Sequence, residues 1–149
     1  MSGEQSDLTL ALLEDAAEAE GLLRLLRPNL DDATFAKRLS RAVAQGYRVF
    51  AAYMGGALAG ALGFRLTDDL CWGRTLFVDD LIVAPNHRGQ GVGALLLDQA
   101  QAHAAREDCD HLRLCSGLTR EAAHRFYMTQ GLSRSSIQFV VSLSERRPS

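Results

Sequence analysis

One short segment of the chain constrains its fold more than any other. In Val78–Leu97, with the sequence VDDLIVAPNHRGQGVGALLL, a strand-like apolar run stops at Pro85, and a polar loop then leads into glycines and an apolar helical pattern. Proline cannot donate a backbone hydrogen bond, so the strand ends there, and glycine accepts backbone angles that other residues avoid. The segment therefore predicts a strand, a tight loop and a helix in direct succession.

The residues before this segment predict helices followed by an antiparallel meander. The leucines at 8, 10 and 12 alternate as in a strand, and Gly55-Gly56 joins the strand-like runs 47–54 and 57–66 in a hairpin. A third run, 74–84, extends the meander. The expected helices are one that begins at Asp15 and ends before Pro28, and one through Phe35, Leu39 and Val43 that is capped by Asp31 or Asp32 and stopped by Gly46.

The residues after the loop predict a β-α-β unit with one more helix and strand. The expected elements are a helix over 91–106, a strand over 111–115, a helix capped by Thr119 that runs to Gln130, and a closing strand over 136–143 with alternating Ile137, Phe139, Val141 and Leu143. The predicted order is thus β-α-α-β-β-β-α-β-α-β. The apolar alternation of the last strand suits pairing between subunits, so a homodimer is allowed.

Composition excludes several classes of protein. The 149 residues match one domain, 1–149, and the net charge of −2 without a basic run argues against nucleic acid as a partner. Apolar stretches are too short for a membrane span, and residues 1–7 do not resemble a secretory signal. The three cysteines, at 71, 109 and 115, lack metal-site spacing, so we expect reduced thiols, no metal and a cytoplasmic protein.

The glycines of the loop predict an anion site. Gly89, Gly91 and Gly93 stand where the helix begins, where unpaired backbone N–H groups attract a phosphate, and Arg88 adds a cation. A nucleotide P-loop is excluded because no Lys-Ser/Thr pair follows. Gly89, Gly91 and Ala94 formally match a dinucleotide fingerprint, but residues 85–88 separate them from the strand, and the expected acidic ribose ligand is missing near position 115.

The string from Arg88 to Gly93 resembles the coenzyme A loop of the GNAT family of N-acetyltransferases. The resemblance implies an α/β (α+β) fold: the acyl-CoA acyltransferase fold, with a mixed, mainly antiparallel sheet flanked by helices. It also implies acetyl-coenzyme A (acetyl-CoA) as co-substrate, with Leu81, Ile82 and Val83 pairing with pantetheine through their backbone. The implied pyrophosphate loop consists of Arg88, Gly89, Gln90, Gly91, Val92, Gly93 and Ala94.

A second motif supports the same family. The segment 116–132, SGLTREAAHRFYMTQGL, is similar to the family's A-x-x-F-Y-x-x-x-G-F/L helix, through Ala123, Phe126, Tyr127, Gly131 and Leu132. In the family the tyrosine at the position of Tyr127 acts as general acid toward the leaving thiolate, a step that a positioned phenol can perform. Arg120 stands where the family commonly has an asparagine that contacts the pantetheine arm, so it joins the expected cofactor-binding residues.

Transfer to an amine also needs a proton acceptor, and Asp79 and Asp80 are the candidates. By strand alternation the two point to opposite faces, so we expect only one of them in a given cleft and favour Asp80, with water as an alternative. The acceptor pocket is expected from the first two helices, the turn 68–72 and the C-terminal strands. The acidic residues at 31, 32, 68, 69, 79 and 80 suit a cationic acceptor, either a small amine or a lysine side chain.

The resulting expectation is an N-acetyltransferase that moves an acetyl group from acetyl-CoA to a primary amine by direct attack in a ternary complex. Two alternatives belong to other classes: a non-catalytic acyl-CoA-binding sensor, and a dinucleotide-binding oxidoreductase. The identity of the amine, the choice between acetyl and longer acyl donors, and the oligomeric state are left open by the residues.

Overall fold

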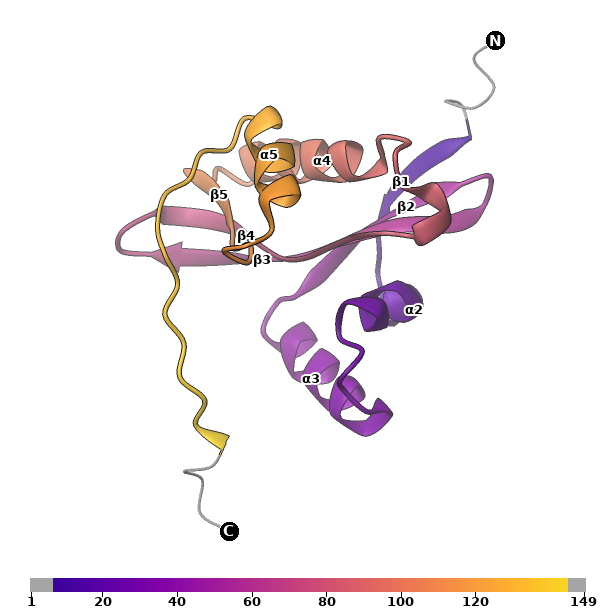
Figure 1. Cartoon of the computed structure of the whole chain (residues 1–149), viewed down its shortest axis with the longest axis horizontal. Coiled ribbons are helices and arrows are strands. Elements are labelled where there is room, and N and C mark those ends of the chain that lie inside the picture. Colours follow the sequence, from indigo (N-terminus) through magenta and orange to yellow (C-terminus); the bar gives the residue numbers. More distant parts are fainter. Residues whose placement is uncertain (1–6, 145–149) are drawn as a thin grey trace. The chain divides into compact units, whose positions relative to one another are not determined.

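The computed structural model describes residues 7–144, and its parts 7–114 and 115–144 are described in turn. In the first part, the strands form a five-stranded sheet in the order β1-β2-β3-β4-β5 (Figure 1). Strands β1 to β4 are antiparallel to their neighbours, and β5 runs parallel to β4. This confirms the mixed, mainly antiparallel sheet. The strands are β1 (Leu8–Leu12), β2 (Arg48–Met54), β3 (Ala57–Asp69), β4 (Gly73–Val83) and β5 (His111–Leu114).

The predicted hairpin and helix boundaries are largely confirmed. Gly55 and Gly56 both have positive φ, 57° and 85°, as the tight turn between β2 and β3 requires. The Asp31 side chain accepts a hydrogen bond from the Thr34 amide at 2.7 Å and caps α3. The helical elements of this part are η1 (Ala16–Ala19), α2 (Glu20–Leu23), η2 (Arg24–Leu26), α3 (Asp32–Ala44), η3 (Pro85–His87) and α4 (Val92–Arg106).

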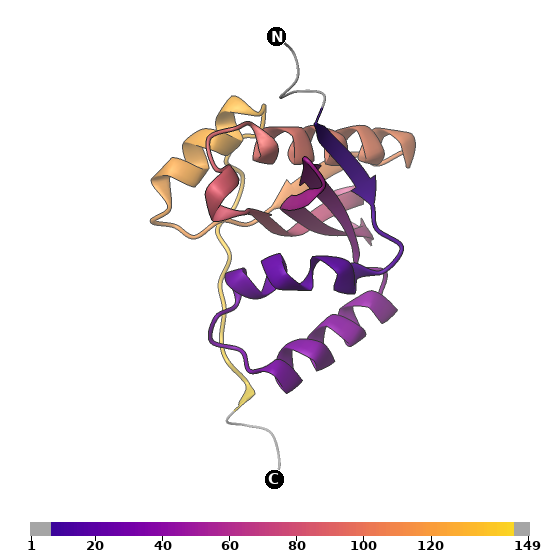
Figure 2. The ribbon, with the colours of Figure 1, turned by 90° about the vertical axis from the view of Figure 1, so that its right-hand side faces the viewer.

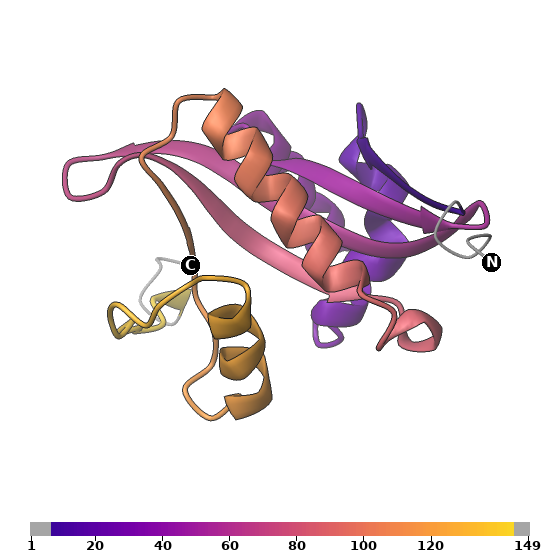
Figure 3. The same cartoon turned by 90° about the horizontal axis from the view of Figure 1, so that it is seen from above.

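Helices cover both faces of the sheet. One face carries α4, which lies over the central strands (Figure 3), while η1, α2 and α3 lie on the opposite face (Figure 2). The α4 face is tightly packed at Gly60, where an added Cβ would lie 2.7 Å from Val92 Cγ1 and 3.0 Å from Leu96 Cδ1. The opposite face buries Leu22, Leu23, Phe35 and other apolar side chains against β2, β3 and β4. Each face thus excludes water by its own set of contacts.

The second part, 115–144, contains α5 (Glu121–Thr129) and corrects two expectations. Thr119 does not cap this helix: Arg120 occupies the N-cap position without a side-chain hydrogen bond, and the Thr119 carbonyl accepts a hydrogen bond from the Glu121 amide. Gly131, with φ 94°, follows the helix end as predicted.

The second correction concerns the closing strand over 136–143, which the described residues do not form. The side chains of Ile137, Phe139 and Val141 are 62%, 90% and 76% exposed. Alternating apolar residues make a strand only when a sheet edge supplies hydrogen-bond partners, and alternation alone does not supply that edge. The homodimer that was based on this strand stays a prediction.

Candidate active site

A one-residue bulge in β4 brings two carboxylates to the same cavity. In the register between β3 and β4, Gly63 pairs with Asp80 and Phe64 pairs with Val78, so Asp79 has no partner on β3. The extra residue breaks strict alternation. Asp79 and Asp80 consequently line one cavity, and the expectation that only one of them faces a given cleft is wrong.

The cavity has a volume of about 290 Å³ and lies between the first helices and the sheet. As expected, the first helices contribute to its wall, through α2 and α3. Among the described residues, the turn 68–72 contributes none of the lining side chains, and the expected C-terminal strand is not formed. The apolar lining residues are Leu23, Leu30, Phe35, Leu39 and Ala42, and the polar ones are Arg27, Arg38, Gln45, Tyr47, Arg65, Asp79 and Asp80.

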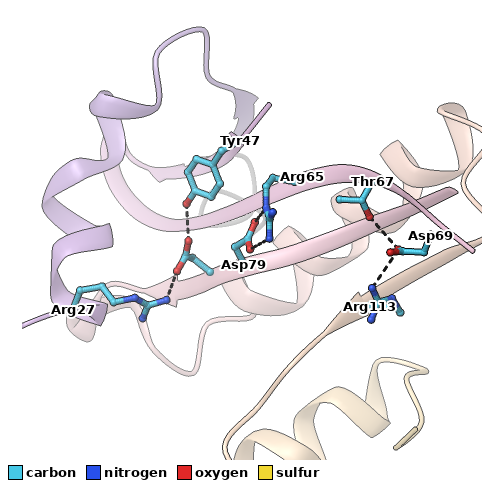
Figure 4. A network of polar contacts seen from close by, with 8 residues as sticks. Arg27, Tyr47, Arg65, Thr67, Asp69, Asp79 and Arg113 are labelled. Carbon is cyan, nitrogen blue, oxygen red and sulfur yellow. Dashed lines mark hydrogen bonds and ion pairs between the residues drawn. The ribbon is translucent and has the colours of Figure 1, made fainter. Parts of the chain in front are cut away.

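Asp80 is held by two donors that come from distant parts of the chain. The Tyr47 hydroxyl donates to Asp80 Oδ2 at 2.8 Å, and Arg27 Nη2 donates to Oδ1 at 2.5 Å. Figure 4 shows Arg27 and Tyr47 converging on this carboxylate. Burial raises the pKa of Asp80 above its ordinary value, although both donors act in the opposite direction. A carboxylate with a raised pKa accepts a proton more readily than an exposed aspartate does.

Tyr47 depends on a glycine for its position. Its ring is buried, and a Cβ at Gly63 would overlap the Tyr47 hydroxyl and ring, so only glycine leaves room for it. Burial, followed by the charge of Asp80, raises the pKa of Tyr47, which therefore stays a neutral hydrogen-bond donor. Neither Tyr47 nor Arg27 belongs to a sequence motif, and neither was predicted as a functional residue. The signal in the sequence was the alternation of small side chains at Ala59, Ala61 and Gly63, which leaves room on one face of β3.

Asp79 is engaged differently. Arg65 binds it through two parallel bonds, Nε to Oδ2 at 2.8 Å and Nη2 to Oδ1 at 2.7 Å (Figure 4). Hydrogen bonding to Asp79 in turn raises the pKa of Arg65, so this cation is permanent. Both oxygens of Asp79 are therefore bound by one guanidinium, whereas the two oxygens of Asp80 have different donors. The two neighbouring aspartates thus have different hydrogen-bond partners.

The glycine loop places two glycines with left-handed backbone angles directly before α4. Gly89 and Gly91 have φ of 78° and 81°, and an added Cβ at either would meet no atom within 4 Å, so the backbone angle and not crowding requires glycine. Gly91 is the N-cap of α4 and provides no side-chain hydrogen bond to its amides. Arg88 is exposed beside them. Amides and guanidinium together fit a phosphate group.

The end of β4 offers a second binding surface. Strand β5 pairs with β4 only over Thr75–Val78, whereas β3 pairs with β4 as far as Val83. Within the described residues, one edge of the backbone at Leu81, Ile82 and Val83 therefore lacks a strand partner. An extended ligand can add to such an edge as another strand would.

The chemistry of the second part centres on α5. Burial raises the pKa of Tyr127, while the charge of Arg120 acts in the opposite direction. His124 Nε2 lies 2.8 Å from the Gly117 carbonyl oxygen and ties the preceding loop to the helix. Tyr127 is consequently a neutral phenol that can donate a proton.

The comparisons with known proteins decide the family. The model of the Acetyltransferase (GNAT) family matches residues 11–132. The chain belongs to the GNAT family. This confirms the resemblance carried by the two motifs, and it takes the place of the dinucleotide interpretation of Gly89, Gly91 and Ala94. As a GNAT protein the chain is an acetyl-CoA-dependent N-acetyltransferase.

Curated relatives of this GNAT chain agree with the assignment. An uncharacterized N-acetyltransferase of Bacillus subtilis, YhdJ, is 34% identical over 115 residues, which cover 76% of this chain and 81% of the relative. An aminoalkylphosphonate N-acetyltransferase of Salmonella typhimurium is 33% identical over 66 residues, which cover 44% of this chain and 43% of the relative.

Solved structures share the fold at low identity. An aminoglycoside acetyltransferase from an uncultured soil metagenomic sample, in complex with sisomicin, has a TM-score of 0.78 at 17% identity and covers 94% of this chain and 99% of its own. AAC(6')-Iy, in complex with a bisubstrate analogue that contains coenzyme A, has a TM-score of 0.74 at 18% identity and covers 91% and 97%.

Two further observations concern the described residues. Within 7–144 no helix is both long enough and apolar enough to cross a membrane. The three cysteines are free thiols, and burial raises the pKa of Cys109.

Proposed function

We propose that the chain transfers an acetyl group from acetyl-CoA to a primary amine, of a small molecule or a lysine, that enters the cavity lined by Asp79 and Asp80. The observation that carries the proposal is Asp80 itself, a carboxylate with only 17% of its side chain exposed and a raised pKa at the cavity wall. The same strand continues into the open edge at Leu81–Val83, so acceptor and co-substrate would meet along β4. That proximity favours direct attack in a ternary complex.

The residues that would hold acetyl-CoA fit an extended, anionic ligand. Backbone groups of Leu81, Ile82 and Val83 would pair with the pantetheine arm, and one amide of this edge would polarise the thioester carbonyl. Arg88 and the backbone of the loop, residues 88–94, would bind the pyrophosphate, with Arg120 as an additional contact. When bound, acetyl-CoA supplies an acetyl group activated as a thioester.

Asp80 would take the proton that the attacking amine loses. An ammonium ion has no free electron pair, so the acceptor must lose a proton before or during attack. Asp80 is better suited than Asp79 because its pKa is raised, whereas Asp79 is bound by Arg65 through both oxygens. Tyr47 and Arg27 act through Asp80 and are positioning residues. Transfer through one water molecule satisfies the same requirement.

Tyr127 would return a proton to the thiolate that leaves. The assignment comes from the motif built on Ala123, Phe126 and Tyr127, and the raised pKa of the phenol keeps it protonated before the reaction. General acids of this kind contribute roughly 10²- to 10⁴-fold to rate.

The test is an assay of coenzyme A release from acetyl-CoA with a panel of primary amines, together with a thermal-shift titration. We expect amine-dependent release and stabilisation by acetyl-CoA but not by NADH. Replacing Gly91 with valine should abolish the stabilisation, because φ of 81° strains a β-branched residue. Stabilisation without release for every amine would identify an acyl-CoA sensor and contradict the proposal.

Tyr127→Phe tests the general acid. We expect kcat to fall about 10²-fold, while the dissociation constant of acetyl-CoA stays within about twofold, because the substitution removes the proton and keeps the ring. Tyr53→Phe, at an aromatic residue of β2 outside the proposed machinery, is the matched control. An unchanged kcat for Tyr127→Phe would contradict the assignment of Tyr127 as the general acid.

A further inference from the structure

The charged side chains that line the cavity indicate which class of amine it accepts. This inference rests on the proposed function. Three guanidinium groups line the cavity, from Arg27, Arg38 and Arg65, against the two carboxylates of Asp79 and Asp80. Each carboxylate already has its own arginine: Arg27 pairs with Asp80, and Arg65 pairs with Asp79. The third arginine leaves the cavity with an excess of positive charge.

Arg38 is the group responsible for that excess. It lies on α3, is exposed, and has no hydrogen bond or ion pair to any residue within 7–144. Its guanidinium offers five N–H donors in a planar arrangement that matches a carboxylate or phosphonate. Among the charged side chains that line the cavity, it alone is left without a partner in the described part of the chain.

The aspartates that suggested a cationic acceptor all have hydrogen-bond or ion-pair partners within the protein. Those of the two helices and of the turn have partners within the described residues, just as the two in the cavity do. Asp31 caps α3, Asp32 pairs with Arg24, Asp68 with Arg74, and Asp69 with Arg113. Each of these four carboxylates is therefore engaged with another group of the protein, and none of them lines the cavity, so the sequence-based argument for a cationic acceptor loses its physical basis.

We infer that the acceptor is a small amine that carries an anionic group, with a short apolar spacer between the two. Arg38 binds the anionic group, and Asp80 receives the amine. Leu30, Phe35 and Leu39 line the same cavity and contact the spacer. A volume of about 290 Å³ lies at the lower end of the range for small-molecule pockets, which favours a free amino acid or aminophosphonate over a protein side chain.

The experiment compares acceptors that share the reacting amine and differ in charge at the other end. The panel contains glycine, β-alanine and γ-aminobutyrate, the alkylamines of equal length, the corresponding diamines and the aminoalkylphosphonates. We expect kcat/KM to be about tenfold higher for the best anionic amine than for its neutral analogue, and lowest for the diamine. The phosphonate arm distinguishes the two anion chemistries.

Arg38→Gln is the decisive variant, and Arg41→Gln is its control on the same helix, since Arg41 is exposed and does not line the cavity. We expect Arg38→Gln to raise KM for the anionic amine about tenfold, to leave kcat nearly unchanged, and to leave the neutral amine unaffected. Arg38→Lys should restore part of the preference. A wild-type preference for the diamine, or an anion preference that survives Arg38→Gln, would overturn the inference.

A binding measurement separates this inference from the proposed function. If wild-type protein releases no coenzyme A with any amine, the proposed transfer is wrong, whereas titration calorimetry still reports recognition. In the presence of coenzyme A, the anionic amine should bind wild-type protein and the Arg41→Gln variant about tenfold more tightly than the Arg38→Gln variant. Equal affinity for the three proteins, or no binding to any of them, would overturn the inference.

Discussion

Both faces of the sheet depend on a glycine of β3 that leaves room for a neighbouring side chain, but with different consequences. On the α4 face, Gly60 of β3 gives room to the side chains of Val92 and Leu96, so the apolar side of α4 packs closely on the strands. Three residues later, on the opposite face, Gly63 gives room to the Tyr47 ring, and its hydroxyl holds Asp80. Glycine at position 60 permits close helix packing, and glycine at position 63 permits the hydrogen bond between Tyr47 and Asp80.

The two faces also differ in what they bury. Phe50 and Phe64 stack on the α4 face with ring centroids 5.2 Å apart, and His103 packs edge-on against both. The opposite face buries part of a carboxylate, which is unfavourable unless hydrogen bonds and an opposite charge compensate for the lost water. The first face therefore depends on shape, and the second depends on a complete set of polar partners.

The largest expected effect comes from Asp80→Asn on the polar face. We expect kcat/KM to fall about 10²- to 10³-fold because the amide cannot accept a proton. Binding of acetyl-CoA should be unchanged. Asp79→Asn is the matched control and should cost less than tenfold, because that carboxylate is bound by Arg65. Equal losses in the two variants would contradict the separate roles.

The pH profile sharpens this prediction. Because burial raises the pKa of Asp80, the carboxylate takes up its proton at a higher pH than an ordinary aspartate, whose value is 3.8. As the pH falls, kcat/KM should therefore decrease for two reasons: Asp80 takes up a proton, and the amine is converted to its ammonium form. In Asp80→Asn only the second cause is left, so the slope of log kcat/KM against pH should be smaller below neutrality.

The second effect compares the two glycines directly. Gly60→Ala and Gly63→Ala should each lower the free energy of unfolding by about 1–3 kcal/mol, because a methyl group enters an already filled space. Only Gly63→Ala should also change the pH profile of kcat/KM, since it displaces Tyr47 from Asp80. Urea unfolding and steady-state kinetics measure the two quantities. A pH profile of Gly63→Ala equal to that of the wild type would contradict the claim that Gly63 positions Tyr47 on Asp80.

The smallest effect concerns His103 on the apolar face. Burial lowers its pKa below the ordinary 6.5, so the folded protein holds the ring neutral while the unfolded chain takes up a proton. The contribution of His103 to the free energy of unfolding should therefore be fully present above pH 6.5 and decline as the pH falls below that value. His103→Leu should make urea midpoints less dependent on pH in this window. The same pH dependence in wild type and variant would show that other groups cause it.

Much of the fold and one half of the candidate site could be predicted from the sequence. The hairpin turn at Gly55-Gly56, the cap at Asp31, and the loop with Gly89 and Gly91 were all predicted because each depends on the backbone preferences of a few adjacent residues. The family followed from two such local motifs.

What only the tertiary structure decided involves residues that are far apart in the chain. The bulge at Asp79 depends on the register against β3, and Arg27 reaches Asp80 across 53 positions. The strand expected over 136–143 failed for the same reason, because pairing requires an edge that the segment does not contain. Sequence by itself determined the local conformations and the family. The three-dimensional arrangement determined which charges meet, because the energy of a charge depends on its neighbours in space.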